Sequence, residues 1–287
     1  MMRLAALIFG GLLLWGCAPD PQPASPAFWK VETPGGGKAW LLGTIHSLER
    51  PADWRSPEID AGLAQSDLVL VEVAGLGDGS AMGKVFEALA TSANLPPLSM
   101  RVEPSLRGKL GEVLDAHALS DNGFDTTETW AAALIIAQAE AHKLDSKYGI
   151  DRAVIEAAGA KPIEELEGAA AQLSLFDTLP EAEQRDLLEA IVRDAQSLDG
   201  ESPALAEAWR KGDMKTITRE TGKGLLADPE LRQTLFTGRN ARWAERISTL
   251  LSDGAKPFVA VGAAHMAGPD GLPAMLEERG FAVSRVQ

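Results

Sequence analysis

Two Gly-x-x-His segments lie near opposite ends of the chain, and each follows an apolar run. The first is Gly43-Thr-Ile-His46 and the second is Gly262-Ala-Ala-His265, and they hold two of the four histidines. Each run predicts a buried strand whose end turns out of the sheet, because glycine permits a close turn before the histidine. Open α/β sheets bind ligands at the carboxyl ends of their strands. The two imidazoles are therefore expected to face one crevice.

A third apolar run, residues 68–73, carries a carboxylate near its end as Glu72. The run is rich in β-branched residues and predicts a strand buried on both faces. A buried, unpaired glutamate is costly, so Glu72 requires a proton, a cation or a metal. The simpler alternatives are an ion pair with an arginine, or a position in water beyond the last pleat. Two histidines and a glutamate are a suitable ligand set for a divalent transition metal with an open position for water.

Strand patterns gather at the two ends of the chain, whereas the middle has helical periodicity. We expect strands at 39–45, 68–73, 257–261 and 281–286, with a helix at 271–279 between the last two. Helices are expected at 128–142, 181–196, 203–211 and 240–251. These patterns predict an α/β fold, with α+β as the alternative. A mostly parallel sheet is built from the terminal segments, and a large helical insertion, about 104–251, lies over its carboxyl edge as a candidate lid.

The ordered set of motifs resembles the TraB/GumN (TraB/PrgY/GumN) family, whose eukaryotic relatives include the Tiki proteases. The resemblance covers roughly residues 28–287 as a single domain. Besides the two Gly-x-x-His segments and Val71-Glu72, the matching stretches are Tyr148-Gly149-Ile150-Asp151, Leu166-Glu167 with Gln172, Arg239-Asn240-x-x-Trp243, and the ending from Val261 to Leu272.

The resemblance implies a metal-dependent hydrolase that acts on peptide bonds. His46 and His265 would hold a divalent ion, with Glu72 as a third ligand or as the base that takes a proton from water. Arg239 and Asn240 would stabilise the developing oxyanion. Glu167, Asp151 and Gln172 are second-tier candidates for the site.

Simpler explanations exist for several of these residues. Asn240 and Asp151 are each suited to capping a helix, and Arg239 to pairing with a surface carboxylate. His117 and His142 lack a glycine turn or a carboxylate at ligand spacing, so both are expected to be structural. Two other functions also stay open: a periplasmic lipoprotein that binds haem, a metal or a signal peptide without turnover, and a metal-independent esterase with a histidine as general base.

Composition narrows the class of protein and its location. The 287 residues are 45% hydrophobic, enough for one sizeable core, and a net charge of −14 argues against nucleic acid as a partner.

Residues 1–17 have the apolar stretch of a signal segment and end at Cys17, the single cysteine, as in a bacterial lipobox. Residues 18–27 form a Pro/Ala-rich tether. The expected location is the outer membrane, through a lipid on Cys17 and facing the periplasm, with a secreted or soluble periplasmic protein as the alternative.

Overall fold

The computed structural model describes residues 19–75, 79–141, 143–195 and 203–287. Two residues discussed above, Cys17 and His142, lie outside these ranges. The expectations of a lipid anchor at Cys17 and of a structural role for His142 therefore stay predictions.

A six-stranded sheet in the order β6-β5-β7-β3-β2-β8 organises the fold. The strands β6, β5, β7 and β3 are parallel, and β2 is antiparallel to both of its neighbours. The prediction of an α/β fold with a mostly parallel sheet is thus confirmed. The strand bounds are β2 Phe28–Glu32, β3 Lys38–Thr44, β5 Leu68–Val71, β6 Ile163–Glu165, β7 Pro257–Gly262 and β8 Ala282–Arg285; β1 Gln22–Pro23 and β4 Ala52–Asp53 form a separate short ladder.

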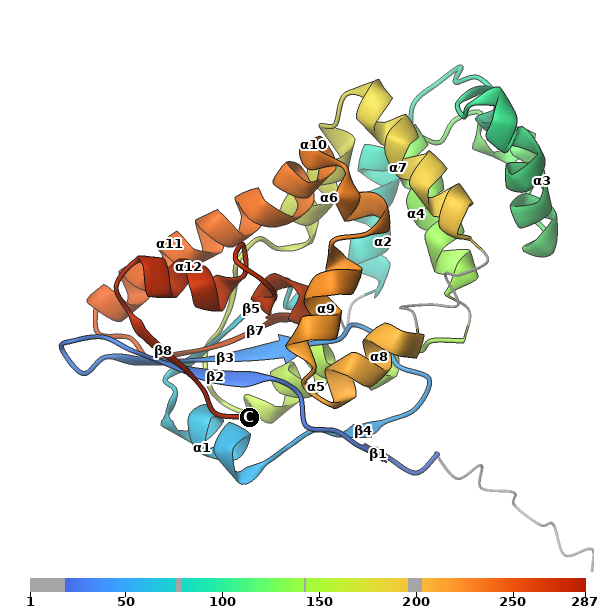
Figure 1. Ribbon diagram of the computed structural model, residues 1–287. Helices are drawn as coiled ribbons and strands as arrows, with labels where there is room; N and C mark the ends of the chain where they lie inside the picture. The colour runs from blue at the N-terminus through green and yellow to red at the C-terminus, as the bar shows by residue number, and fades with distance from the viewer. Residues whose placement is uncertain (1–18, 76–78, 142, 196–202) are drawn as a thin grey trace, which may run out of the picture.

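Both faces of the sheet are buried, because successive side chains of a strand point to opposite sides. On β3, Trp40 and Leu42 enter one core, whereas Ala39 and Leu41 enter another. The helices α1 (Pro57–Gln65) and α5 (Ile150–Ala157) cover the first face. The second face is covered by α11 (Gly238–Ser252) and α12 (Leu272–Glu278), so the sheet lies between two helical layers (Figure 1).

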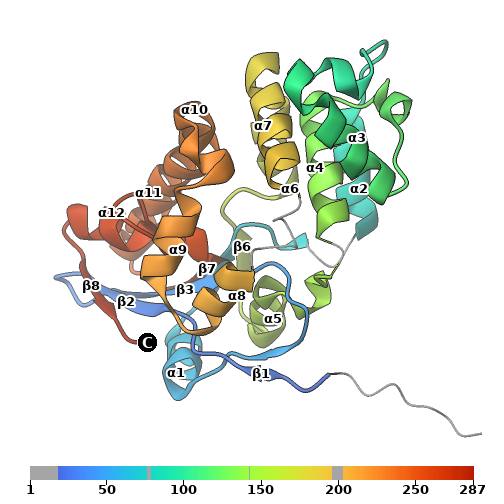
Figure 2. The same cartoon turned by 45° about the vertical axis from the view of Figure 1, so that its right-hand side comes forward.

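A group of helices beside the sheet has a hydrophobic core of its own and forms the helical lobe. Its members are α2 (Gly79–Ala90), α3 (Arg107–Ala116), α4 (Thr129–Glu140), α6 (Ala169–Asp177) and α7 (Glu181–Asp194). The side chains of Leu110, Trp130 and Leu187 are fully buried in this core. Figure 2 shows the lobe standing apart from α11 and α12.

The middle of the chain is less uniform than the sequence suggested. The predicted helices at 128–142, 181–196, 203–211 and 240–251 correspond to α4, α7, α8 (Pro203–Arg210) and α11. However, two elements within 104–251 are not part of the helical lobe: β6 is a strand of the sheet, and α5 covers one face of the sheet. The lobe also begins earlier than residue 104, with α2. The helical insertion therefore consists of separate excursions from the sheet and is not one continuous block.

The carboxyl-terminal strand-helix-strand unit also differs in detail from the expected one. The strands β7 and β8 run in the same direction, as predicted, but β3 and β2 lie between them.

Within the ranges that the structure describes, no helix is long and apolar enough to cross a membrane.

Candidate functional site

Three neighbouring parallel strands end at one edge of the sheet and carry the predicted ligands. Glu72 follows β5, His265 follows β7, and His46 follows β3. A Cβ atom added to Gly262 would lie 3.4 Å from Glu72 Oε1, 3.6 Å from His46 Nε2 and 3.8 Å from His265 Cδ2. The three side chains therefore surround one small space in front of Gly262, as the sequence predicted.

The glycines of the two Gly-x-x-His segments do not form the close turns that the sequence predicted. Neither has a positive φ, and both lie within strands. A Cβ on Gly43 would lie 3.1 Å from Cα of Ala263, and a Cβ on Gly262 would enter the space between the candidate ligands. Gly43 therefore allows close packing on Ala263, whereas Gly262 leaves open the space between the three side chains.

His265 is a buried imidazole held by hydrogen bonds. Its Nδ1 lies 2.6 Å from Asn240 Oδ1, and its Nε2 lies 3.3 Å from Arg239 Nη1. Both partners fit one tautomer, in which Nδ1–H donates to the amide oxygen and Nε2 carries the lone pair. Burial lowers the pKa of His265 to about 3, so the ring is neutral at physiological pH. A neutral imidazole is the form that binds a metal.

His46 differs from His265 because its side chain is 59% exposed. Its Nδ1 lies 2.9 Å from Oδ2 of Asp151, whose other oxygen accepts a 2.5 Å hydrogen bond from Thr44 Oγ1. This arrangement directs His46 Nε2 toward Gly262. A carboxylate behind an imidazole is the usual support of a metal-binding histidine.

Asp151 is therefore a site residue and does not cap a helix. The cap of α5 is Gly149, and the Asp151 side chain is buried beneath His46. Gly149 packs so closely on the carbonyl oxygen of His46 that a Cβ would overlap it. The Tyr148-Gly149-Ile150-Asp151 stretch thus fixes both the backbone and the ring of His46.

Glu72 is buried, and both of its carboxylate oxygens accept hydrogen bonds. Its Oε1 accepts from the Gly262 N–H at 2.8 Å, and its Oε2 accepts from Arg239 Nη2 at 2.7 Å and from Gln172 Nε2 at 3.1 Å. Burial raises the pKa of Glu72, but His265, His46 and Arg239 and the Gly262 N–H outweigh it and lower the pKa to about 2. Glu72 is consequently a carboxylate at any physiological pH, and the arginine pair considered above is present.

Arg239 links two buried carboxylates. Its Nη2 lies 2.7 Å from Glu72 Oε2 and 2.8 Å from Glu167 Oε2, and its Nη1 donates to the carbonyl oxygen of Leu235 at 3.2 Å. These are not surface carboxylates, because Glu72 and Glu167 side chains are 6% and 7% exposed. The predicted second-tier residues Glu167 and Gln172 thus lie close to Glu72, the first through Arg239 and the second by a direct hydrogen bond.

Asn240 is completely buried, and both ends of its amide are used within the protein. Its Oδ1 contacts His265, and its Nδ2 donates to the carbonyl oxygen of Asp270 at 2.6 Å. It lies inside α11, whose cap is Thr237, so it is not a helix cap. Asn240 positions His265, and Arg239 positions Glu72. Neither presents an unused donor for the predicted oxyanion contact.

A wide π-helical turn explains why these two side chains point inward together. The segment η7 (Gln233–Thr237) joins α10 (Pro229–Arg232) to α11, and Arg239 and Asn240 follow it directly. Such turns shift the helical register and are frequent at functional sites. The Phe236 ring stacks on His265 at a centroid distance of 5.1 Å, and Trp243 lies 4.5 Å from the same ring.

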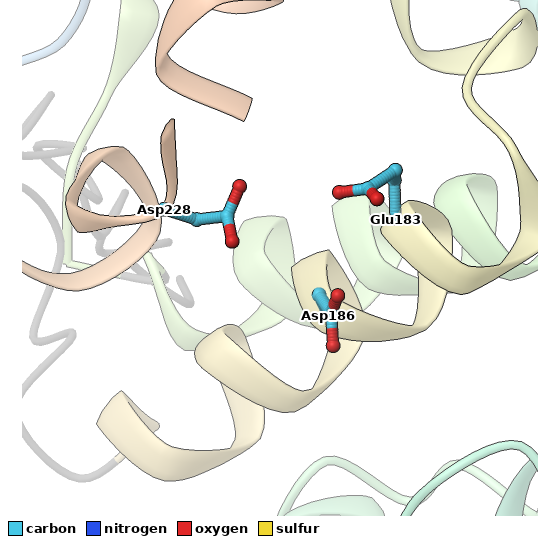
Figure 3. Close-up of side chains that lie close together, drawn as sticks. All are labelled: Glu183, Asp186 and Asp228. Atoms are coloured by element: carbon cyan, nitrogen blue, oxygen red, sulfur yellow. The ribbon is translucent and has the colours of Figure 1, made fainter. Parts of the chain in front are cut away.

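Acidic side chains also gather away from the sheet edge. Of all groups of three His, Cys, Asp or Glu in the described part of the chain, one has ligand atoms that all lie within 4.8 Å, namely Glu183, Asp186 and Asp228 (Figure 3). Exposed acidic clusters commonly hold no metal, and Asp228 Oδ1 is used to cap α10. The atoms of His46, Glu72 and His265 are thus more widely spaced than this limit. An ion held by all three side chains would therefore require them to move closer together.

Several residues at the site carried no clear signal in the sequence. Thr44 supports Asp151, and its only sequence clue is its position inside the first Gly-x-x-His segment. Trp209 from α8 donates from Nε1 to the carbonyl oxygen of Gly43 at 2.9 Å. Together with Leu205 and Ile217, Trp209 walls a pocket beside the two histidines. His117 is paired with Glu140 on the helical lobe, consistent with its predicted structural role.

The fold and site define an α/β protein with a His, Glu, His cluster at the carboxyl ends of three adjacent strands. The chain belongs to the TraB/PrgY/gumN family, whose sequence profile matches residues 27–285. No curated protein and no solved structure matches the chain significantly.

Proposed function

We propose that this protein is a metal-dependent hydrolase that cleaves peptide bonds. The supporting observation is the paired orientation of two imidazoles, each with Nδ1 engaged by an oxygen acceptor, Asp151 for His46 and Asn240 for His265. Oxygen acceptors behind both rings make the Nε2 atoms the candidate ligand atoms, and His265 Nε2 would exchange its 3.3 Å contact with Arg239 Nη1 for the ion. The nearby anionic Glu72 completes the kind of donor set that binds a divalent transition metal.

The side chains divide the work between binding and positioning. When bound, a divalent ion supplies Lewis-acid activation of water and of a substrate carbonyl. Glu72 Oε1 accepts a single hydrogen bond, from Gly262, so it is the oxygen available as a third ligand. A carboxylate whose pKa is about 2 is a poor proton acceptor. Glu72 therefore suits the role of ligand better than that of general base.

Metal content and affinity test this proposal. The mature domain, purified without affinity tags or chelators, should contain one divalent ion per chain by elemental analysis, and a His46→Ala variant should lose it. By calorimetry with Zn²⁺, Mn²⁺ and Co²⁺, His46→Ala, Glu72→Gln and His265→Ala should each bind at least about 10-fold more weakly. Double variants should be strongly non-additive, because the ligands act as one site.

A matched control is His117→Ala, since His117 lies on the helical lobe in a pair with Glu140. Its metal affinity should equal that of the unchanged protein. Absence of a bound ion, together with equal affinities across the series, would overturn the metal proposal.

One observation favours a second candidate function, a metal-independent esterase. The exposed His46 and the buried Asp151 form a pair that resembles the base and orienting carboxylate of hydrolases without a metal. Activity on ester substrates that survives chelation and is lost in both His46→Ala and Asp151→Ala would select this mechanism over the metal one.

A further inference from the structure

A small apolar pocket opens directly beside the two candidate histidines. It has a volume of about 120 Å³ and is bordered by His46 and His265 on one side. The opposite wall is apolar and comes from two helices: Leu205 and Trp209 from α8, and Ile217 from α9 (Met214–Thr221). This wall has no hydrogen-bonding group to offer a ligand, because Trp209 Nε1 is already bonded to the carbonyl oxygen of Gly43.

The size of this pocket restricts what enters it. An apolar protein cavity of about 150 Å³ holds a benzene ring. The pocket beside the histidines is smaller, at about 120 Å³, and its wall residues Trp209 and Ile217 are each 1% exposed and fixed in the core. A branched aliphatic side chain of three or four carbons therefore matches this volume better than an aromatic ring does.

A second, larger cleft lies on the other side of His46. It has a volume of about 570 Å³ and a polar lining that includes Glu49, Lys143, Asp145 and Lys147. His46 borders both spaces, so a chain that crosses this imidazole has one side chain in the apolar pocket and continues into a wide polar cleft. Opposite charges in the cleft suit the backbone and mixed side chains of a peptide rather than a uniformly charged polymer.

We infer that the pocket formed by Leu205, Trp209 and Ile217 selects peptides with a valine-, leucine- or isoleucine-sized side chain next to the bond that is cleaved. This inference rests on the proposed hydrolase and names its substrate class. The pocket is adjacent to His46 and His265, so a peptide bond next to the selected side chain lies at the candidate metal ligands.

Binding measurements test the pocket independently of catalysis. The probes are the N-acetyl amides of alanine, valine, leucine and phenylalanine, with affinities measured by ligand-observed NMR on the full folded protein in the presence of a chelator. Valine and leucine amides should bind about 10-fold more tightly than the alanine amide, and the phenylalanine amide more weakly than the leucine amide.

The decisive variant is Leu205→Trp, because Leu205 is only half-buried and a larger side chain there fills the pocket without entering the core. This variant should lose the preference for valine and leucine amides. The matched control is Leu225→Trp, the same change at a half-buried leucine packed on the helical lobe. The control should keep the order of affinities. Leu205→Ala, which enlarges the pocket, should improve binding of the phenylalanine amide.

The same variants, loaded with Zn²⁺ and given a peptide library, separate this inference from the proposed function. A size preference in amide binding without bound metal or hydrolysis would overturn the hydrolase and leave the pocket in place. Hydrolysis at equal rates for all side chains, unchanged in Leu205→Trp, would overturn the pocket alone. Failure of every amide to bind, or equal binding of the leucine and phenylalanine amides, would also overturn the pocket.

Discussion

The Nη2 atom of Arg239 lies 2.7 Å from Oε2 of Glu72, and both side chains are buried. The same guanidinium reaches Glu167, so one cation is paired with two carboxylates at the sheet edge. A negative charge that is buried beside two imidazoles is thereby kept ionised and fixed in place. Arg239 therefore positions Glu72, and removing Arg239 should lower the stability of the folded protein.

We predict that Arg239→Ala lowers the free energy of unfolding by about 3–5 kcal/mol, because it leaves Glu72 buried without its cation. Glu167 would keep the more distant Arg242, at 3.6 Å. Urea unfolding followed by circular dichroism measures this loss. The control is Arg246→Ala, whose partner Glu164 lies 2.7 Å away in an exposed pair. That variant should lose less than about 1 kcal/mol. Equal losses in the two variants would show that the buried pair has no special role.

Gly262→Ala should separate metal binding from folding. The new methyl would lie 3.4–3.8 Å from its neighbours, which is ordinary contact distance, so the protein should fold normally. Metal ligands must approach an ion to about 2 Å, and the methyl would fill the space that an ion needs. Calorimetry should show loss of metal binding with an unchanged melting temperature. Gly111→Ala, in open space on α3, serves as control. Retained affinity in Gly262→Ala would place any metal elsewhere.

Asp151→Asn removes the charge behind His46 but keeps the size of the side chain. Because supporting carboxylates raise the basicity of metal-binding histidines, metal affinity should fall about 10- to 100-fold. Isothermal titration calorimetry measures the change. Asp145→Asn is a suitable control, since Asp145 is exposed and pairs with Lys147. A loss of the same size in both variants would point to general electrostatics rather than to support of His46.

Glu183 in the acidic cluster of Figure 3 should make stability depend on pH. Its Oε2 is buried and has no hydrogen-bond partner among the residues that the structure describes. Burial, together with the charges of Asp228, Asp186 and Glu230, raises the pKa of Glu183. Because the folded protein holds this proton more tightly than the unfolded chain does, the stabilisation is complete below the unfolded pKa. It is lost as the pH rises through the raised folded pKa.

At pH 7 the ionised Glu183 is repelled by the neighbouring carboxylates, so Glu183→Gln should stabilise the protein by about 0.5 kcal/mol. Near pH 4 the substitution should have little effect. Thermal melts at the two pH values measure the difference. Glu181→Gln is the control, since Glu181 pairs with Arg185 on the same helix at 2.9 Å and should not be stabilising. A gain that is equal at both pH values would contradict the assignment of the effect to titration of Glu183.

Cys17→Ser tests the proposed lipid anchor. Cys17 directly follows the apolar signal segment, so the substitution should abolish labelling by a clickable fatty acid and release the protein from the membrane fraction. Unchanged attachment of the variant would refute the lipoprotein proposal. Release of the unchanged protein as well would indicate simple secretion.

The candidate ligands could be predicted because the apolar pattern that indicates a strand is a local feature of the sequence. Apolar runs that end in Glu72, His46 and His265 predict parallel strands, and the carboxyl ends of such strands meet at one edge. The strand β2 was not expected, and β6 was indicated only by a short strand-like stretch at 161–163. β6 has three residues, and β2 contains Lys30 within its apolar run, so neither gives a strong pattern.

The partners of the ligands were harder to predict because tertiary contacts decide them. Capping was the better local explanation for Asp151, yet Asp151 lies beneath His46, 105 positions earlier in the chain. The apolar periodicity of α8 indicates that one of its faces is buried, but not that Trp209 faces the histidines. Arg239 and Asn240 point inward because of the π-helical turn before them, for which the sequence has no simple signature.

The pairing of β3 with β7 determines when the site can exist during synthesis. Leu41 of β3 pairs with Val259 of β7. The inner strand β3 is therefore synthesised long before its partner strand β7. Until β7 is available, β3 is covered on one edge by β2 and unpaired on the other. Such distant pairing slows folding and exposes an apolar strand edge to aggregation. The nascent chain is therefore an expected client of chaperones, and the candidate site cannot form before β7 has been made.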